Sequence, residues 1–185
     1  MRIAFMGVSG SGKDYLANYL INNYEFIRLS FSDQLKKLAH HIYPWLEKDY
    51  QPEEKSLPLN IVLSTGEKIT CSPRDIWLNL NSLRKIEEQI FIRMLTEEIK
   101  SIDNTKNIII TDVRSTNELL WCKNNKFTII YIEREHNNYE NYDIDKYVVE
   151  NKSKSDYVFN NATLGTNAFR YFFKEAFIVS IHQDG

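Results

Sequence analysis

The sequence predicts a three-layer α/β protein, with a central parallel sheet of about five strands and helices on both faces. Short apolar runs, typical of buried strands, alternate along the chain with segments whose apolar residues recur at helical spacing. Such alternation favours right-handed strand–helix–strand crossovers, and these produce a parallel sheet. Residues 60–71 hold two β-prone runs around Ser-Thr-Gly-Glu, which predicts a small hairpin inserted between helices.

The expected elements follow from these patterns in chain order. We expect strands at residues 2–8, 26–31, 107–112, 127–133 and 157–159. We expect helices at residues 13–23, 32–41, from 72 onward, 85–100, 116–123 and 166–177. Ser32 and Ser72 are the expected N-caps of two of them, and Pro73 suits a first helical position.

The whole chain, residues 1–185, is expected to form a single domain, since no linker or internal repeat interrupts it. Residues 44–72 are expected to form an insertion made of a loop and the hairpin. Residues 134–155 are rich in Asn, Tyr and Lys and are expected to form a mobile, lid-like segment.

Composition excludes several classes of function. Apolar residues make up 43% of the chain, charged residues 26%, and the net charge is −2, the balance of an ordinary globular protein. No basic tract predicts nucleic-acid binding, and no apolar run reaches the roughly 20 residues that span a membrane. Cys71 and Cys122 lack metal-ligand spacing, so a reducing cytoplasmic setting is expected. Homodimer formation stays open.

A glycine-rich loop carries the strongest chemical signal. Residues 7–14 read Gly-Val-Ser-Gly-Ser-Gly-Lys-Asp, which matches G-x-x-x-x-G-K between a strand and a helix. Glycines let backbone N–H groups close around phosphate oxygens, and Lys13 supplies a cation for the β- and γ-phosphates. The structural alternative is a glycine- and serine-rich turn that happens to carry a lysine. The context of the loop predicts binding of a nucleoside triphosphate.

Two carboxylates are candidates for holding Mg²⁺. Asp14 follows Lys13 where Ser or Thr would normally help to hold the metal, and it could bind directly or through water. It could also be only a favourable acidic residue in the first turn of a helix. Asp112 ends the apolar run 107–112, at the sheet edge that faces the phosphate loop. Its alternative role is to cap the turn into the next helix.

Several charged residues could bind a phosphorylated acceptor. Asp33 and Lys36 lie one turn apart at the start of a helix, where Asp33 could orient the acceptor or take its proton and Lys36 could pair with its phosphate. Arg74 and Arg84 flank the short helix expected from residue 72 and offer the bidentate geometry that phosphate needs. Each of the four could instead be a solvated surface charge.

Two more arginines follow predicted strands. Arg114 comes two residues after Asp112 and could clamp the acceptor or the transferred phosphate, or form a plain salt bridge with Glu118. Arg134 follows the strand at 127–133, where its planar cation could stack on adenine or reach the triphosphate.

The order of these segments resembles a known family. The sequence has SGKD at 11–14, FSDQLK at 31–36, SPRD at 72–75, TDVRSTNE at 111–118 and DYVFNN at 156–161. It is similar to the deoxynucleoside monophosphate kinases of tailed phages and their P-loop kinase relatives, where these segments read roughly SGKDT, FADPLK, TPR, DVRxxNE and D-x-x-I-x-N. The resemblance spans nearly the whole chain, and the order and spacing carry more weight than any one motif.

The resemblance implies a P-loop kinase fold and transfer of the ATP γ-phosphoryl group to a (deoxy)nucleoside monophosphate with Mg²⁺. It also implies a cytoplasmic enzyme, in the host cytoplasm if phage-encoded. The expected catalytic residues are Lys13, Asp33, Arg74 and Arg114. The expected ATP-binding residues are Gly7, Ser9, Gly10, Ser11, Gly12, Lys13, Asp14, Tyr15 and Arg134. The expected acceptor-binding residues are Asp33, Lys36, Arg74, Arg84 and Arg114, and the expected metal ligands are Asp14 and Asp112.

The chain departs from the family pattern at several positions. Tyr15 stands where the family has Thr, and Gln34 where it has Pro. Residues 80–82 read Leu-Asn-Ser in place of the LGT segment that precedes the family arginine resembled by Arg84. The several lid arginines of the family are missing between residues 134 and 156, so the closing element would be short or rely on lysines.

Three other functions remain as alternatives. Phosphomevalonate kinase of the animal type shares SGKD and a similar leucine-lysine segment, and dephospho-CoA kinase shares the phosphate loop. The second of these phosphorylates a hydroxyl, so it would need Asp33 as a true base. The third alternative is a nucleotide-binding module that has lost transfer activity and acts through partners.

Overall fold

A computed structural model describes residues 1–51, 53–134, 143–163 and 165–178 of the chain. The chain divides into two compact units, one formed by residues 1–30 and 102–185 and the other by residues 31–101. No helix in the described part of the chain is both long enough and apolar enough to cross a membrane.

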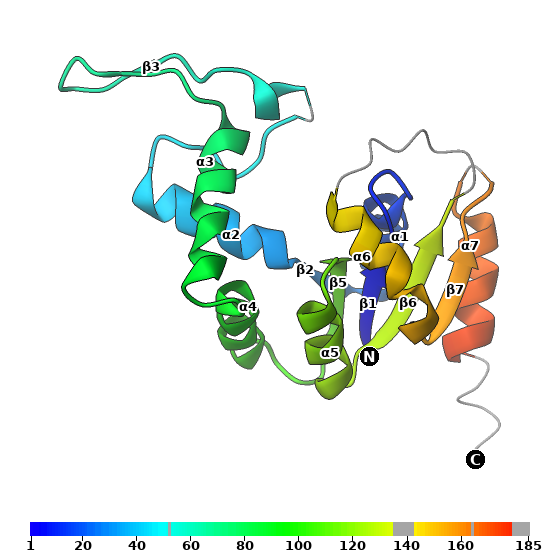
Figure 1. The fold of residues 1–185 in the computed structure, drawn as a ribbon. Coiled ribbons are helices and arrows are strands. Elements are labelled where there is room, and N and C mark those ends of the chain that lie inside the picture. Colours follow the sequence, from blue (N-terminus) through cyan, green and yellow to red (C-terminus); the bar gives the residue numbers. More distant parts are fainter. Residues whose placement is uncertain (52, 135–142, 164, 179–185) are drawn as a thin grey trace. The chain divides into compact units, whose positions relative to one another are not determined.

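The first unit is built on a five-stranded parallel sheet (Figure 1). The strand order is β2-β5-β1-β6-β7, so the first strand lies in the middle. The strands are β1 (Arg2–Met6), β2 (Phe26–Leu29), β5 (Asn107–Val113), β6 (Thr128–Glu133) and β7 (Tyr157–Asn160). Because all five strands are parallel, their carboxyl ends meet at one edge, and the β1–α1 connection lies at that edge. The predicted fold class is confirmed.

Helices cover both faces of this sheet, as the continuous burial of its central strands requires (Figure 1). The helices α1 (Lys13–Tyr24) and α7 (Asn167–Phe173) pack on one face, where Phe169 contacts Phe5 and Phe159 in edge-to-face geometry. The helices α5 (Thr116–Asn124) and α6 (Asp143–Glu150) lie on the other face. The chain continues from α7 as a π-helix, Lys174–Ile178.

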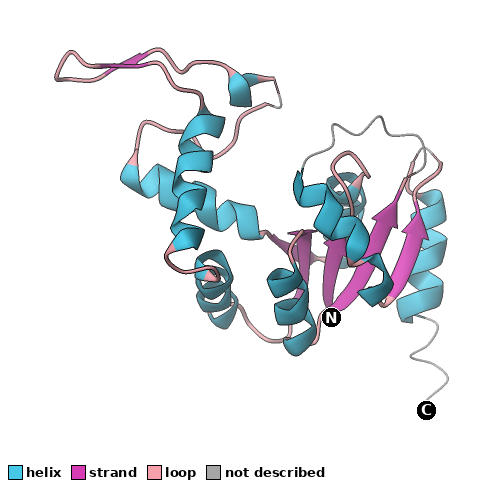
Figure 2. Ribbon diagram, viewed as in Figure 1, coloured by secondary structure: helices cyan, strands magenta, loops and turns pink. Residues whose placement is uncertain are grey.

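The second unit is mainly helical (Figure 2). It contains α2 (Phe31–Ile42), α3 (Pro73–Asn81) and α4 (Ile90–Lys100). The predicted hairpin is present as β3 (Ile61–Val62) paired antiparallel with β4 (Lys68–Ile69). Two short 3-10 helices, Glu54–Ser56 and Ser82–Lys85, complete the unit. Ala39, Leu46 and Ile76 form one core cluster of the unit, with partly buried aromatic and leucine residues packed against it.

Two predicted helix starts are wrong. The helix expected from Ser32 begins at Phe31, so Ser32 lies inside its first turn and does not cap it. Phe31, the first residue of α2, is 2% exposed and so belongs to the buried side of the helix. The helix expected from residue 85 begins at Ile90. Ile86 fits the apolar spacing of that helix but is 86% exposed, so it is not part of the buried stripe.

The polar segment 134–155 contains two helical elements where it is described. Residues 143–150 form α6, and a 3-10 helix follows at Lys152–Lys154. The sequence predicted neither element. Buried Val148 anchors α6, and Asn151 donates a hydrogen bond from Nδ2 to the carbonyl of Tyr147 at 2.8 Å. Residues 135–142 of the expected lid lie outside the described residues.

The cap predicted at Ser72 is confirmed. Its side chain accepts a hydrogen bond from the backbone N–H of Asp75 at 3.2 Å, and Asp75 accepts one from the backbone N–H of Ser72 at 3.0 Å. These reciprocal bonds form a capping box with Pro73 at the first helical position. They fix the start of α3 and therefore the place of Arg74 in its first turn.

Candidate active site

The phosphate loop connects the end of β1 at Met6 to the start of α1 at Lys13. Gly12 is the N-cap of α1 with φ 92°, a left-handed conformation that favours glycine. Gly12 has no side chain that could cap this helix, and the loop leads directly to the positive dipole end of α1. A loop of this kind leads to a site suited to an anion.

Lys13 is folded into the loop that it follows. Its ammonium donates hydrogen bonds to the carbonyls of Gly7 and Val8, each at 2.7 Å, and to Ser11 Oγ at 3.3 Å. The residue is only 6% exposed, so its charge is held within the loop, close to where phosphate oxygens would lie. Asp14 and Tyr15, in the first turn of α1, are both exposed.

Asp112 lies near the end of β5, the strand that pairs with β1. The register between these strands shifts between Ala4 and Met6, opposite this part of β5. One oxygen of Asp112 accepts a hydrogen bond from Ser30 Oγ at 2.8 Å, which orients the carboxylate. Sequence reasoning did not single out Ser30, although it directly follows the second strand, because a serine there has many possible roles.

Arg114 follows β5 at the same edge of the sheet and is half-buried. Its backbone N–H donates to Glu118 Oε2 at 2.9 Å, and the N–H of Ser115 donates to the same oxygen at 3.0 Å. Glu118 is 3% exposed and completes a capping box with Ser115 at the start of α5. This cap fixes the backbone from which the guanidinium of Arg114 extends.

Arg134 directly follows β6 and is half-buried. Its neighbour in the chain, Glu133, is the last residue of β6 and forms an ion pair with Lys152. The Lys152 ammonium also lies 5.5 Å from the centroid of the Tyr131 ring. A lysine from the segment after α6 therefore lies over β6, and the ion pair binds that segment to the sheet.

The structure also shows a loop contact that sequence reasoning missed. Asn161, directly after β7, donates a hydrogen bond from Nδ2 to the carbonyl of Ser11 at 2.9 Å. Asn161 lies in the DYVFNN segment. The family resemblance therefore includes this residue, but it implies no role for it. Its contact with the loop depends on β7 lying beside β6, which local sequence patterns do not specify.

The other expected acceptor-binding residues all belong to the second unit. Lys36 lies 3.6 Å from Asp33 and 3.4 Å from Asp49 in ion pairs, and 5.7 Å from the centroid of the Trp77 ring. Asp33 and Lys36 do share one face of α2, as expected. The Asp33 and Lys36 side chains remain about a quarter exposed, at 24% and 22%.

The two arginines of the second unit have different surroundings. Arg74 is exposed in the first turn of α3. The guanidinium of Arg84 lies 5.0 Å from the centroid of the Phe91 ring, and its Nε donates to Asn81 Oδ1 at 3.1 Å. Those contacts give Arg84 a local structural role in the turn before α4.

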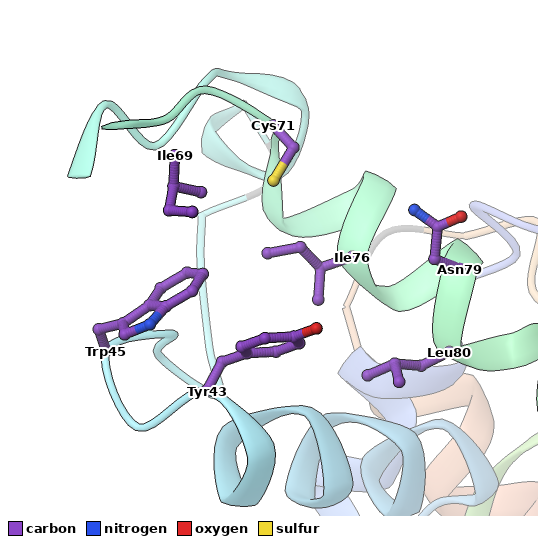
Figure 3. Close-up of a pocket in the computed structure, with 7 residues that line it drawn as sticks. All are labelled: Tyr43, Trp45, Ile69, Cys71, Ile76, Asn79 and Leu80. Atoms are coloured by element: carbon purple, nitrogen blue, oxygen red, sulfur yellow. The ribbon is translucent and has the colours of Figure 1, made fainter. Parts of the chain in front are cut away.

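A pocket of about 280 Å³ also lies within the second unit (Figure 3). Tyr43, Trp45, Ile69, Cys71, Ile76, Asn79 and Leu80 line it. On α3, Arg74 is two residues before Ile76 and so points about 200° away around the helix. A phosphate bound by Arg74 would therefore lie on the other side of α3 from this pocket.

The described residues contain no group of three His, Cys, Asp or Glu side chains that could hold a metal ion. The expected metal ligands Asp14 and Asp112 stay a prediction. Mg²⁺ that accompanies a nucleotide is usually held by one or two carboxylates, substrate phosphates and water. The half-buried carboxylate of Asp112, oriented by Ser30 beside β1, suits such a site.

Comparison with solved structures supports the fold. Dephospho-CoA kinase from Campylobacter jejuni is similar with a TM-score of 0.56 and 16% identity, over 97% of this chain and 98% of that chain. Protein TT1252 from Thermus thermophilus is similar with a TM-score of 0.53 and 16% identity, over 99% of this chain and 97% of that chain. No protein-family model and no curated protein matches the sequence. The chain has the P-loop kinase fold.

Proposed function

We propose that the chain is a nucleoside monophosphate kinase, which transfers the γ-phosphoryl group of ATP to a (deoxy)nucleoside monophosphate. The observation that carries the proposal is the phosphate loop, in which Lys13 is held against the loop carbonyls at the uncapped start of α1. Asp112 and Arg114 follow at the same edge of the sheet. Such a set of groups can bind a triphosphate and stabilise the charge that develops during its transfer.

The charges of the second unit favour a phosphorylated acceptor. Lys36 and Arg74 offer cations, and the phosphate of a nucleoside monophosphate is already ionised at neutral pH. Transfer to such an acceptor needs alignment and charge neutralisation and no strong general base. Asp33, which lies 3.6 Å from the ammonium of Lys36, would then orient the acceptor.

Mg²⁺ would be held by Asp112, with Asp14 as a further candidate on α1. When bound, the ion neutralises charge on the phosphate oxygens. In this proposal Lys13 binds the donor phosphates, and Arg114, which lies just before the capped start of α5, binds the group being transferred.

A second candidate is dephospho-CoA kinase, because a protein of that name has a similar fold. Its acceptor is a hydroxyl, which must lose a proton during transfer. Asp33 would then have to leave its ion pair with Lys36 and act as the base. This additional requirement makes us prefer the nucleotide acceptor.

The test is an acceptor screen with ATP and Mg²⁺, read by ADP release. It should offer every NMP and dNMP, together with dephospho-CoA and phosphomevalonate. We expect at least one nucleoside monophosphate to be phosphorylated, and Lys13→Ala to abolish that activity. Lys106→Ala is the matched control, since Lys106 is an exposed lysine of the same unit.

Two outcomes would contradict the proposal. Transfer to dephospho-CoA or phosphomevalonate, with none to a nucleotide, would assign another small-molecule kinase activity. ATP binding without transfer to any acceptor would favour a regulatory nucleotide-binding module.

A further inference from the structure

Asn161 connects the last strand of the sheet to the phosphate loop, although 150 positions separate it from Ser11. The residue directly follows β7 and is 8% exposed. Its side chain is a buried amide, and buried amides lower stability unless they are hydrogen-bonded. The bond to the Ser11 carbonyl at 2.9 Å provides a partner.

The backbone of Asn161 is held independently of that side-chain bond. Its N–H donates to the carbonyl of Glu133 at the end of β6, at 2.6 Å. Asn161 therefore has a fixed position relative to the sheet, and its amide extends from there to the loop. A displacement of the loop would break the side-chain bond without changing the strand.

The hydrogen bond to Ser11 also determines the direction of a donor in the loop. A peptide group is planar and trans, so the carbonyl of Ser11 and the N–H of Gly12 point in opposite directions. Asn161 draws the carbonyl toward β7, and the Gly12 N–H consequently points away from Asn161. Gly12 is the N-cap of α1, where backbone N–H groups bind phosphate oxygens.

The packing around Gly12 is matched to this contact. A Cβ atom on Gly12 would lie 2.4 Å from Asn161 Nδ2, closer than any real contact. The glycine lets the amide reach Ser11, and the amide in turn stabilises the loop with Gly12 at φ 92°. Gly12 and Asn161 therefore depend on each other, although they lie near opposite ends of the chain.

We propose that Asn161 is a positioning residue, which orients the Ser11–Gly12 peptide so that the Gly12 N–H can bind a phosphate oxygen of a nucleoside di- or triphosphate. The proposal rests on the proposed function only in that the loop binds a nucleotide. It does not depend on which acceptor is phosphorylated.

Asn161→Asp tests the proposal because Asp has nearly the same shape and, when ionised, cannot donate a hydrogen bond. Asn161→Ala removes the donor without adding charge. Asn160→Asp is the matched control, since Asn160 is the exposed neighbour and receives the same charge change. The dissociation constant of ADP should rise roughly 10- to 100-fold in both Asn161 variants, as expected for a lost buried hydrogen bond, and stay near wild type in Asn160→Asp.

Hydrogen exchange of the loop amides gives a second measurement that needs no ligand. The amides of residues 11–13 should exchange faster in both Asn161 variants than in wild type, while the β1 amides keep their protection. In a transfer assay, the KM for ATP should rise while the KM for the acceptor stays unchanged.

Unchanged ADP affinity and unchanged loop exchange in folded Asn161 variants would overturn the proposal. Weakened binding in Asn161→Asp but not in Asn161→Ala would also overturn it, because charge would then be the cause. ADP binding by the wild-type chain is a separate result. Its absence would contradict the proposed function, and the exchange measurement would still decide the role of Asn161.

Discussion

Replacing Gly12 with alanine should destabilise the phosphate loop through two effects that the structure separates. Gly12 has φ 92°, and an alanine in a left-handed conformation costs about 1–2 kcal/mol. Its Cβ would also lie 2.4 Å from Asn161 Nδ2, so the amide must move by about 1 Å to reach an ordinary contact. That displacement breaks the bond to Ser11, which costs about 1–3 kcal/mol more.

A double-mutant cycle with Asn161→Ala isolates the second effect. In wild type, Gly12→Ala should lower the free energy of unfolding by roughly 2–5 kcal/mol. In the Asn161→Ala background no amide meets the new Cβ, so only the backbone cost of about 1–2 kcal/mol should remain. The expected coupling between the two positions is therefore about 1–3 kcal/mol.

Gly165→Ala is the matched control for the backbone effect. Gly165 has φ 89° in the same unit, and no atom of the described residues lies within 4 Å of a Cβ placed there. Urea unfolding can be followed by Trp121 fluorescence after Trp45→Phe and Trp77→Phe, since Trp121 is the tryptophan of the first unit. The explanation is refuted if Gly12→Ala costs no more than Gly165→Ala, or costs the same in both backgrounds.

Two further predictions concern the thiols and an acidic group. Cys71 is exposed, whereas burial, followed by the charges of Glu118 and Asp112, raises the pKa of the Cys122 thiol. A disulfide reagent should therefore modify Cys71 rapidly in the folded chain and Cys122 only on unfolding. In the Cys71→Ser variant Cys122 is the remaining thiol, so fast reaction of the folded variant would contradict this prediction. Burial opposes ionisation of Glu98, but hydrogen bonds from Lys37 and Gln34 keep its pKa below the ordinary value of 4.5. Glu98→Gln should therefore be less stable than wild type at pH 7. The difference in unfolding free energy should shrink as the pH falls below about 4.5. A difference that does not depend on pH would show that the charge of Glu98 is not its cause.

Much of the first unit follows from local sequence patterns. The apolar runs predict the strands because parallel strands are buried on both faces, and β5 and β6 are nearly continuous in burial. The phosphate loop is predictable because its glycines and lysine lie within eight residues. Ser72 and Pro73 predict the start of α3 for the same reason, since a capping box is a local interaction.

Local spacing gave wrong results where packing decided the outcome. Ile86 fits the stripe of an amphipathic helix, yet it lies outside α4 and is exposed. At Glu87, both carboxylate oxygens accept hydrogen bonds from Arg93 at 2.8 Å, and α4 starts only at Ile90. A pattern of apolar residues cannot distinguish such a turn from the first turn of a helix, because both carry the same residue types.

The glycines of the phosphate loop show why its motif alone does not define the site. A Cβ on Gly7 would lie 2.5 Å from the carbonyl of Ile132, and one on Gly12 would meet Asn161. Both glycines are therefore required by the ends of neighbouring strands, β6 and β7, and not only by a bound phosphate. Gly10 differs, since it is exposed with φ 73°. The loop takes its shape from residues more than a hundred positions away, so a sequence could keep the motif and lose the site when a residue such as Asn161 changes.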